Sequence, residues 1–468
     1  MSEVLERAFD AAEKSNWQIK TLGEVCRTSS GGTPSRSRPE FFNGNIPWVK
    51  SGELTDGLVS EVSEFISKEA LAGSSAKLLP AGTLLIAMYG ATVGKLGVLA
   101  RAATTNQAVC AIFPPPELDP KFLFWYLRRQ RSNLIAKAVG GAQPNISQTI
   151  LRDLELPIPP LSEQREIVAE LEKQFSRLDE AVANLQRVKA NLKRYKASVL
   201  KAAVEGRLVE TEASIAHREG RTFETGEQLL QRILEERRAK WSGRGKYKPP
   251  VSSLGNKLSE LPDGWTWATA DQLTYLITSG SRGWGDFYSD TGVLFIRAQD
   301  IKTDALNLPD AARVDVPEDA ESTRSSVSKG DILVTITGAN VTKSALVPAL
   351  GELAFVSQHV ALMKLSMPET ASFVFNWIIS PANGRKTLES WAYGAGKPGL
   401  SLEQMRALPI ALPPLAEQIR IVAEVDRHLS IVSEVEAEVD TNLKRARALR
   451  QATLAKAFLS QSNAGVSL

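Results

Sequence analysis

Apolar residues recur at alternating steps of three and four in two long stretches of the chain, with polar residues between them. This spacing places the apolar side chains on one stripe of an α-helix and repeats every seven residues, as in a coiled coil. The pattern predicts one helix over 159–208 and a second over 413–460. Each would be roughly 65–70 Å long at about 1.5 Å per residue. The expected seam residues are Val168, Leu171, Phe175, Leu178, Leu185 and Leu192 in the first helix, and Val425, Leu429, Val432 and Val439 in the second.

The two seams suit each other as packing partners. The core positions of the first helix are mostly leucine, whereas those of the second are mostly β-branched or small. We therefore expect the helices to pair with each other as an antiparallel coiled coil. Two separate amphipathic helices, each packed on its own domain, are the alternative that this pattern leaves open.

The chain also contains an internal repeat. The segment PPLSEQ at 159–164 recurs as PPLAEQ at 413–418, which is 254 residues later. Further upstream, Trp17 matches Trp265 and Gly90 matches Gly338, both at an offset of 248 residues. An ordered series of matches whose offset rises toward the C-terminus is typical of a duplication with small insertions in the second copy. The first and second repeats each consist of a globular domain followed by a long helix.

The segments before the long helices have the features of β-structure. Short apolar runs at 84–88 and 332–336 each lead into a glycine-containing turn, which is typical of buried strands. The expected fold class is α+β, with two tandem strand-rich domains separated by the two long helices. The predicted divisions are a first domain at 1–158, a first long helix at 159–208, a short helix and basic linker at 209–257, a second domain at 258–412, a second long helix at 413–460 and a flexible tail at 461–468.

Composition narrows the class of protein. The 468 residues include 56 Lys and Arg and 53 Asp and Glu, and a net charge of +3 does not by itself indicate a nucleic-acid binder. The two cysteines, Cys26 and Cys110, are too few for a disulfide framework. The N-terminus has no signal-peptide pattern, and proline and glycines interrupt the longest apolar stretch, 78–94. We therefore expect a cytoplasmic protein that does not enter a membrane.

Catalytic motifs are weak or missing. The segment GATVGKL at 90–96 is one residue short of a phosphate-binding loop and lacks the Ser or Thr that would hold Mg²⁺, so a glycine turn after a strand is the better interpretation. The three histidines are isolated in sequence and have no companions at metal-binding spacing. The sequence therefore predicts a binding protein with no catalytic residue and no metal site of its own.

Four segments carry a resemblance to a known family. They are LPIPPLSEQ at 156–164, LPPLAEQ at 412–418, LLQRILEER at 229–237 and KLSELPDGWTW at 257–267. Through these segments the chain resembles, over essentially its whole length, the specificity subunit of type I restriction-modification enzymes. The resemblance implies two target recognition domains, each of which reads one half of a split, asymmetric sequence in double-stranded DNA. The long helices would set the spacing between the halves.

The resemblance also implies the partners. Two methyltransferase subunits would dock on the helices, bring S-adenosylmethionine and flip the target adenine. Motor-nuclease subunits would join for cleavage and use ATP with Mg²⁺. This chain itself would hold no cofactor and would be a non-catalytic subunit.

Base recognition needs side chains that donate and accept hydrogen bonds at the groove edges. The polar loops of the two repeats are the richest source of such groups, and matching loops occur in both. The predicted DNA-binding residues are Ser29, Thr33, Ser35, Arg36, Lys50, Ser51, Tyr89, Thr92, Lys95, Gln143 and Asn145 in the first repeat, and Ser281, Arg282, Arg297, Gln299, Thr337, Asn340, Lys343 and Lys397 in the second.

The two domains differ in charge. Residues 15–160 carry 15 basic and 11 acidic side chains, whereas residues 258–412 carry 12 basic and 17 acidic ones. The second domain therefore cannot be a broad cationic clamp, and we expect the isolated chain to bind DNA poorly. A coiled-coil scaffold that binds only proteins is the alternative function. A self-sufficient enzyme is a third interpretation, and it would require the pure chain to bind S-adenosylmethionine.

Overall fold

The computed structural model describes residues 17–139, 144–241, 246–253, 258–280, 283–302, 304–316, 324–392 and 398–458. The chain divides into two compact units. Unit 1 consists of residues 1–186 and 440–468, and unit 2 consists of residues 187–439. Each unit therefore contains one globular domain and one half of each long helix. No described helix is long and apolar enough to cross a membrane.

The domain of unit 1 is built on a five-stranded mixed sheet with the strand order β2-β9-β6-β7-β4. Its central strands β6 and β9 are buried, because their apolar residues pack on both faces. A smaller sheet of order β5-β3-β8, whose strands alternate along the chain with those of the larger sheet, carries Trp48. The strands are β1 Gln18–Thr21, β2 Arg27–Ser30, β3 Ile46–Val49, β4 Gly57–Val59, β5 Phe65–Ile66, β6 Leu84–Ala87, β7 Leu96–Leu99, β8 Thr104–Thr105, β9 Val109–Phe113 and β10 Glu155–Ile158, and the short helices are α2 Leu22–Val25, α3 Lys68–Ala72, α4 Pro120–Arg129, α5 Arg131–Ala136 and α6 Gln148–Arg152.

The domain of unit 2 repeats this arrangement with a four-stranded sheet of order β12-β20-β17-β18. A second sheet of order β16-β13-β19 takes the place of the smaller sheet. The strands are β11 Thr266–Thr269, β12 Thr274–Ser279, β13 Tyr288–Ile296, β14 Ile301–Lys302, β15 Ala305–Leu306, β16 Ala312–Val314, β17 Ile332–Thr335, β18 Ser344–Leu346, β19 Ala354–Val356, β20 Val360–Leu365 and β21 Pro409–Leu412, and the domain helices are α10 Ala270–Leu273, α12 Ala371–Ile379, α13 Gly384–Trp391 and α14 Leu402–Ala407.

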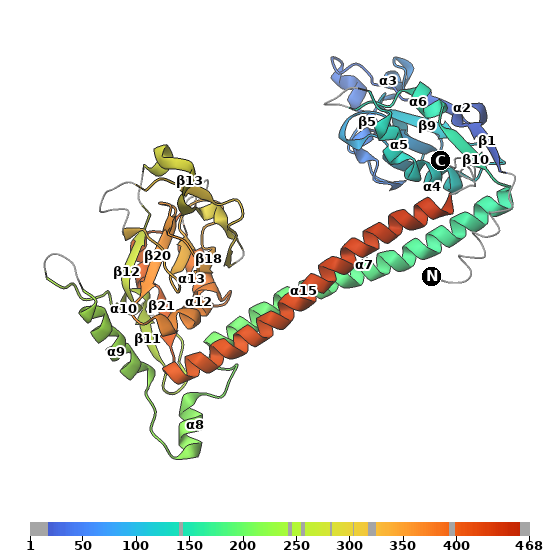
Figure 1. Cartoon of the computed structure of the whole chain (residues 1–468). Coiled ribbons are helices and arrows are strands. Elements are labelled where there is room, and N and C mark those ends of the chain that lie inside the picture. The colour runs from blue at the N-terminus through green and yellow to red at the C-terminus, as the bar shows by residue number, and fades with distance from the viewer. Residues whose placement is uncertain are drawn as a thin grey trace. The chain divides into compact units, whose positions relative to one another are not determined.

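The same register holds the central strands in both repeats. Leu84 of β6 pairs with Ile112 of β9, and Ile332 of β17 pairs with Met363 of β20. Leu84 and Ile332 are 248 residues apart, and Ile112 and Met363 are 251 residues apart. The structural match therefore follows the offsets of the sequence repeat. The predicted fold class is therefore confirmed: two tandem domains of mixed helix and strand, each followed by a long helix (Figure 1).

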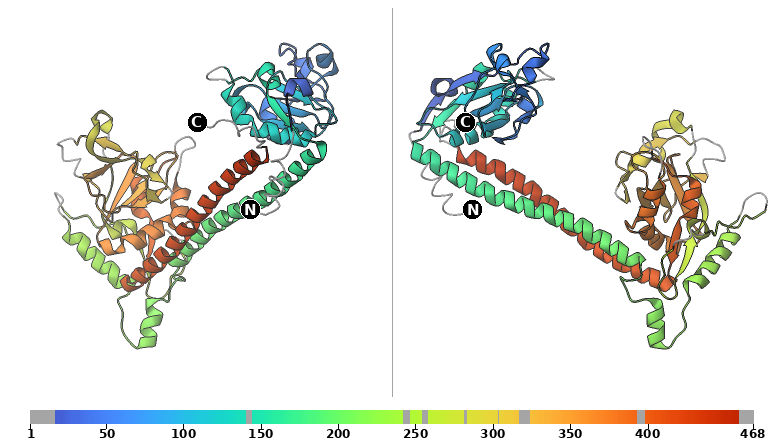
Figure 2. Two further views of the ribbon diagram at one scale, coloured as in Figure 1. Left: turned by 45° about the vertical axis from the view of Figure 1, so that its right-hand side comes forward. Right: turned by 180° about the vertical axis from the view of Figure 1, so that it is seen from behind.

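The long helices are α7 Leu161–Val204 and α15 Leu415–Ala457. In unit 1, Val168, Leu171 and Phe175 near the start of α7 share a core with Leu454 and Ala457 at the end of α15. In unit 2, Val199 and Ala203 near the end of α7 share a core with Ile421 and Val425 near the start of α15. The helices are therefore antiparallel, and Figure 2 shows them side by side from two directions.

The expected seam residues differ in burial along the helices. Val168, Leu171, Phe175, Val425, Val432 and Val439 are buried, whereas Leu178, Leu185, Leu192 and Leu429 are half-buried. The second helix thus buries its β-branched residues more completely than the first buries the leucines of its middle section. Arg450, a polar residue on the seam of α15, donates to both carboxylate oxygens of Asp179 on α7 at 2.7 and 2.8 Å.

Two helices follow α7 where the sequence pattern predicts one. Helix α9, Gly226–Ala239, packs Leu229, Leu230 and Ile233 into the core of unit 2. Helix α8, Glu212–Glu219, was not predicted, because its eight residues carry little apolar periodicity. It begins at a capping threonine, Thr211, whose hydroxyl accepts from the backbone of Ser214.

Candidate nucleic-acid interface

One polar loop leaves the central strand of each domain and is held by the same backbone hydrogen bonds. In the first repeat, Gly90 donates to the Pro144 carbonyl at 3.0 Å, and Ile146 donates to Met88 at 2.8 Å. In the second repeat, Gly338 donates to Pro398 at 2.9 Å, and Leu400 donates to Ile336 at 2.8 Å. The loops 89–95 and 337–343, here called the reading loops, therefore occupy equivalent places and differ at three of their seven positions.

The reading loops share an unusual backbone conformation. Gly90 and Gly94 have φ angles of 72° and 75°, and their counterparts Gly338 and Thr342 have angles of 94° and 71°. Left-handed backbone favours glycine and costs a β-branched residue about 1–2 kcal/mol. The second repeat thus keeps the loop geometry although threonine replaces the second glycine, which indicates that the surrounding structure imposes this shape on the loop.

In the first repeat, the structure brings four predicted residues together at the reading loop. Tyr89 is exposed and forms an isolated β-bridge with Asn145. Thr92 and Lys95 are half-buried on the same loop, where the Lys95 amide donates to the Thr92 carbonyl at 2.9 Å. Phenol, amide, hydroxyl and ammonium groups are all suited to base edges or phosphates.

A second group of predicted residues lies around Trp48. The Trp48 indole donates to the Gly32 carbonyl at 2.9 Å, which ties the loop 29–36 to strand β3. Arg36 stacks over the rings of Phe42 and Trp48 at 4.2 and 5.2 Å. The exposed residues Thr33 and Ser35 lie on this loop, Ser29 accepts from Lys77 at 3.0 Å on strand β2, and Ser51 begins a short 3₁₀ turn after Lys50.

Two cations of this group share one carboxylate. Lys50 and Arg36 each contact Glu64 at 2.7 Å. The hydrogen bond from Lys50 outweighs a partial desolvation and, with Arg36, lowers the pKa of Glu64. The cluster keeps an excess of one positive charge at neutral pH. The Ser30 hydroxyl also accepts from Gln148 at 2.7 Å, so this group is connected to the segment that follows Asn145.

In the second repeat, three predicted residues meet at one place. The Asn340 amide donates to the Ala298 carbonyl at 3.2 Å and accepts from Lys343 at 2.8 Å. Thr337 forms an isolated bridge with Gly399. The reading loop of this repeat therefore packs against the turn 298–300 that follows Arg297.

Arg297 is held by its own neighbours. Its guanidinium contacts both oxygens of Asp300, at 3.0 and 3.1 Å, and donates to the Asp310 carbonyl at 2.9 Å. With its amide oxygen turned toward Arg297, Gln299 accepts from the same guanidinium at 3.1 Å. These bonds give Arg297 a structural role, and a contact to a base stays a prediction. The predicted residues Gln143, Ser281, Arg282 and Lys397 lie outside the described residues.

The repeated PPLxEQ motif has a clear structural role that sequence reasoning did not assign. Glu163 accepts from the Trp17 indole at 3.0 Å, and Glu417 accepts from the Trp265 indole at 2.9 Å. The following Gln164 donates to the Pro159 carbonyl at 2.8 Å, as Gln418 does to Pro413 at 2.9 Å. The motif thus fastens the first strand of each domain to the start of its long helix. The sequence signal for this role is that Trp17 and Glu163 recur together as Trp265 and Glu417.

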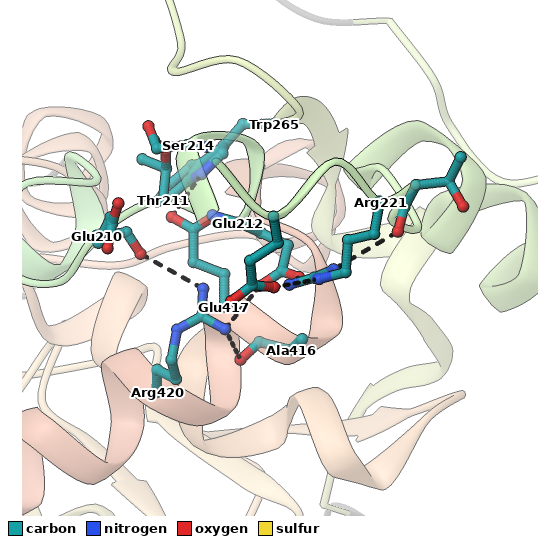
Figure 3. A network of polar contacts seen from close by, with 11 residues as sticks. Glu210, Thr211, Glu212, Ser214, Arg221, Trp265, Ala416, Glu417 and Arg420 are labelled. Atoms are coloured by element: carbon teal, nitrogen blue, oxygen red, sulfur yellow. Dashed lines mark hydrogen bonds and ion pairs between the residues drawn. The ribbon is translucent and has the colours of Figure 1, made fainter. Parts of the chain in front are cut away.

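In the second repeat, this anchor extends to helix α8 (Figure 3). The second oxygen of Glu417 accepts from the Glu212 backbone at 2.8 Å. The side chain of Glu212 binds Arg420 at 2.6 Å and Arg221 at 2.7 Å. Burial raises the pKa of Glu417, and its hydrogen bonds with Glu212 and Trp265 counteract this increase. Within the described parts of the chain, no cluster of three His, Cys, Asp or Glu side chains could hold a metal ion.

Known proteins resemble the chain in sequence. The family model of the type I restriction modification DNA specificity domain matches residues 14–193. The EcoR124I/EcoR124II specificity subunit of Escherichia coli is 32% identical over 160 residues, which are 33% of this chain and 40% of that relative. The EcoBI specificity subunit of Escherichia coli is 27% identical over 380 residues, 77% of this chain and 70% of the relative. The EcoKI specificity subunit of Escherichia coli K12 is 21% identical over 468 residues, 96% of this chain and 89% of the relative.

Solved structures show the same fold. A chain from a study of complex assembly and conformational transition in the type I restriction-modification system matches with a TM-score of 0.64 and 19% identity, covering 94% of this chain and 97% of that one. The HsdS subunit of Thermoanaerobacter tengcongensis matches with a TM-score of 0.51 and 18% identity, covering 95% and 97% of the two chains. A scaffold that binds only proteins is not favoured by these relatives. The family model, the relatives and the solved structures together support a specificity subunit of a type I restriction-modification enzyme.

Proposed function

We propose that each domain of this specificity subunit reads one half of a bipartite, asymmetric DNA target through its reading loop. One observation carries this proposal: the two loops have the same backbone hydrogen bonds but different side chains, YGATVGK at 89–95 and TGANVTK at 337–343. A duplicated scaffold with altered polar tips can present different donors and acceptors to different bases. The two halves of the target would therefore differ in sequence.

The partners supply the chemistry in this proposal. Two methyltransferase subunits bind S-adenosylmethionine and flip the target adenine, and motor-nuclease subunits use ATP with Mg²⁺ for cleavage. This chain is the non-catalytic reader and works in the cytoplasm, where the DNA lies. Because residues 258–412 of the second domain include five more acidic than basic side chains, the methyltransferases would provide much of the binding to the phosphate backbone.

The reading function is tested by making the two loops identical. Only three substitutions are needed, Thr337→Tyr, Asn340→Thr and Thr342→Gly, because the other four positions already match. We expect the variant complex to methylate a motif in which one half is changed and the other half is retained. The motif is measured by single-molecule sequencing of methylated genomic DNA. The matched control is Thr342→Gly alone, which relieves the left-handed threonine and should leave the motif unchanged. An unchanged motif in a stable triple variant would refute loop reading.

An exposed apolar face on the helix pair of unit 2 is the surface that we assign to a methyltransferase. The Tyr195 hydroxyl lies 2.7 Å from Nδ1 of His428 and fixes the antiparallel register. One heptad away, this register places Val188 opposite Val435. Val188, Tyr195, Ile431 and Val435, here called the apolar stripe, are 38–47% exposed. Exposed apolar residues that line up on one flank of both helices favour an interaction surface.

The docking role of the apolar stripe predicts a selective loss of assembly. The double variant Ile431→Asp and Val435→Asp places two charges in the stripe, and we expect it to weaken binding to the methyltransferase at least tenfold, about 1.4 kcal/mol. Titration of the purified subunit measures the Kd. Ile419→Asp is the matched control, because Ile419 is 59% exposed on the same helix but occupies the opposite flank of the heptad. Equal weakening by both variants would contradict the assignment.

A further inference from the structure

An aspartate in left-handed backbone meets a helix arginine in both repeats. Asp56 and Asp304 have φ angles of 67° and 66° and are 248 residues apart. Asp56 forms an ion pair with Arg131 at the start of α5, and Asp304 forms one with Arg385 in α13. The two arginines are 254 residues apart. The pairing is thus duplicated with the fold, although about 75–81 residues separate the partners in each pair.

In the first repeat, this pair holds the end of the reading loop. The Arg131 Nε donates to the Gly94 carbonyl at 2.8 Å, while Nη1 donates to Asp56 Oδ2 at 2.9 Å. Asp56 in turn accepts from the Leu96 amide at 3.0 Å and donates its own amide to the Leu96 carbonyl at 2.8 Å. The two residues thereby fix the backbone on both sides of Lys95.

The ion pair of Asp56 and Arg131 is partly buried and packs closely against Gly94. The side chains of Arg131 and Asp56 are only 25% and 16% exposed. Burial alone would raise the pKa of Asp56, but the hydrogen bonds from Arg131 and Leu96 lower it below its ordinary value, so the carboxylate is charged. A side chain at Gly94 would come within 3.0 Å of the Arg131 Cγ. Glycine suits this position because it adopts a positive φ without strain and leaves room for the side chain of Arg131.

The second repeat keeps the ion pair but not the bond to the loop. The side chains of Arg385 and Asp304 are 16% and 18% exposed. The Thr342 carbonyl, the counterpart of Gly94, accepts instead from the Ser344 hydroxyl at 3.0 Å. The buried Nε of Arg385 has no hydrogen-bond partner among the described residues. Among the described contacts, neither Asp304 nor Arg385 bonds to the second reading loop, so the link from ion pair to loop is specific to the first repeat.

We propose that Asp56 and Arg131 are positioning residues that hold the reading loop of the first repeat in the geometry that selects bases. This inference rests on the proposed function of the loops. A displacement of about 1 Å in such a group can cost two orders of magnitude in a recognition or reaction step. Loss of this pair therefore loosens selection at one half of the target and leaves the other half intact.

The first test is carried out on the full complex of this chain with its methyltransferase. Methylation rates are measured on the wild-type target and on targets with one changed base in either half. Arg131→Gln should reduce discrimination at one half by about tenfold or more and leave the other half within about twofold. Arg131→Lys, which keeps the charge but not the forked geometry, should be intermediate. Arg101→Gln is the matched control, because Arg101 is exposed in the same domain and loses the same charge.

The second test does not depend on DNA. Hydrogen exchange in the full chain should be at least about tenfold faster at residues 94–96 in Arg131→Gln than in the wild type, while strand β9, residues 109–113, should be unchanged. Unchanged exchange at 94–96, or equal loss of discrimination at both halves, would overturn the positioning role. Faster exchange without any target-specific methylation by the wild-type complex would support the positioning role and refute the reading function.

Discussion

Replacement of Lys364 with methionine is expected to destabilise the second domain by about 3–5 kcal/mol, because it leaves a buried carboxylate without its partner. Lys364 on β20 binds Asp331 at 2.6 Å, and both side chains are only 9% exposed. Burial raises the pKa of Asp331 although Lys364 and the Ser328 amide favour the charged form. Urea unfolding of the wild type and the variant measures the difference.

The first repeat supplies the design of a compensating variant. By the register of the central strands, Thr83 and Phe113 occupy the positions of Asp331 and Lys364. The double variant Asp331→Thr and Lys364→Phe should therefore regain most of the lost stability, since a neutral pair of suitable volume avoids the desolvation of both charges. A single variant that loses less than about 1 kcal/mol, or a double variant no better than the single one, would contradict this account.

The same pair predicts the pH dependence of the variant. The folded-state pKa of Asp331 lies above its unfolded value, so the native state binds more protons in that interval and stability falls as pH rises through it. Lys364 lowers the pKa of Asp331, so this pKa should rise further in the folded state when Lys364 is removed. The stability deficit of Lys364→Met should therefore shrink as pH falls below neutrality, because protonation of Asp331 removes the buried charge that needs a partner.

Removal of Glu417 should cost far more than removal of its counterpart Glu163. Glu417→Ala leaves the Trp265 indole and the Glu212 amide without acceptors inside the protein, and we expect a loss of about 3 kcal/mol. Glu163 accepts one indole bond in a half-buried setting, so Glu163→Ala should cost about 1 kcal/mol.

The two Glu-to-Ala variants are compared by chemical unfolding, with hydrogen exchange in α8 as a second measurement. Faster exchange across 212–219 is expected only in Glu417→Ala, because only Glu417 binds the start of that helix. Equal losses from the two substitutions would mean that the contact with α8 contributes no stability.

The sequence carried enough periodicity to predict the long helices and the duplicated domains. A heptad pattern sustained over about five heptads needs no knowledge of distant contacts, and the repeat offsets of 248 and 254 residues align the two folds directly. Helix α8 escaped prediction because it depends on the cap at Thr211 and on Glu417, which lies 205 residues from Glu212.

The candidate site was predicted less completely for a physical reason. Composition identifies loops that contain donors and acceptors, and the structure groups Tyr89 with Asn145 and Asn340 with Lys343. Composition does not show that Arg297 already binds the Asp300 carboxylate and the Asp310 carbonyl, because these bonds form only in the folded turn. The pairs formed by Asp56 and Asp304 with their arginines were equally hidden, since each joins segments far apart in the chain.

The most direct measurement is the methylome of a host that lacks adenine methylation and expresses the methyltransferase with or without this chain. The account predicts a split, asymmetric adenine motif that appears only when the chain is present. A motif that persists without the chain, or no motif from an assembled and soluble complex, would contradict its role as the reader of the DNA sequence.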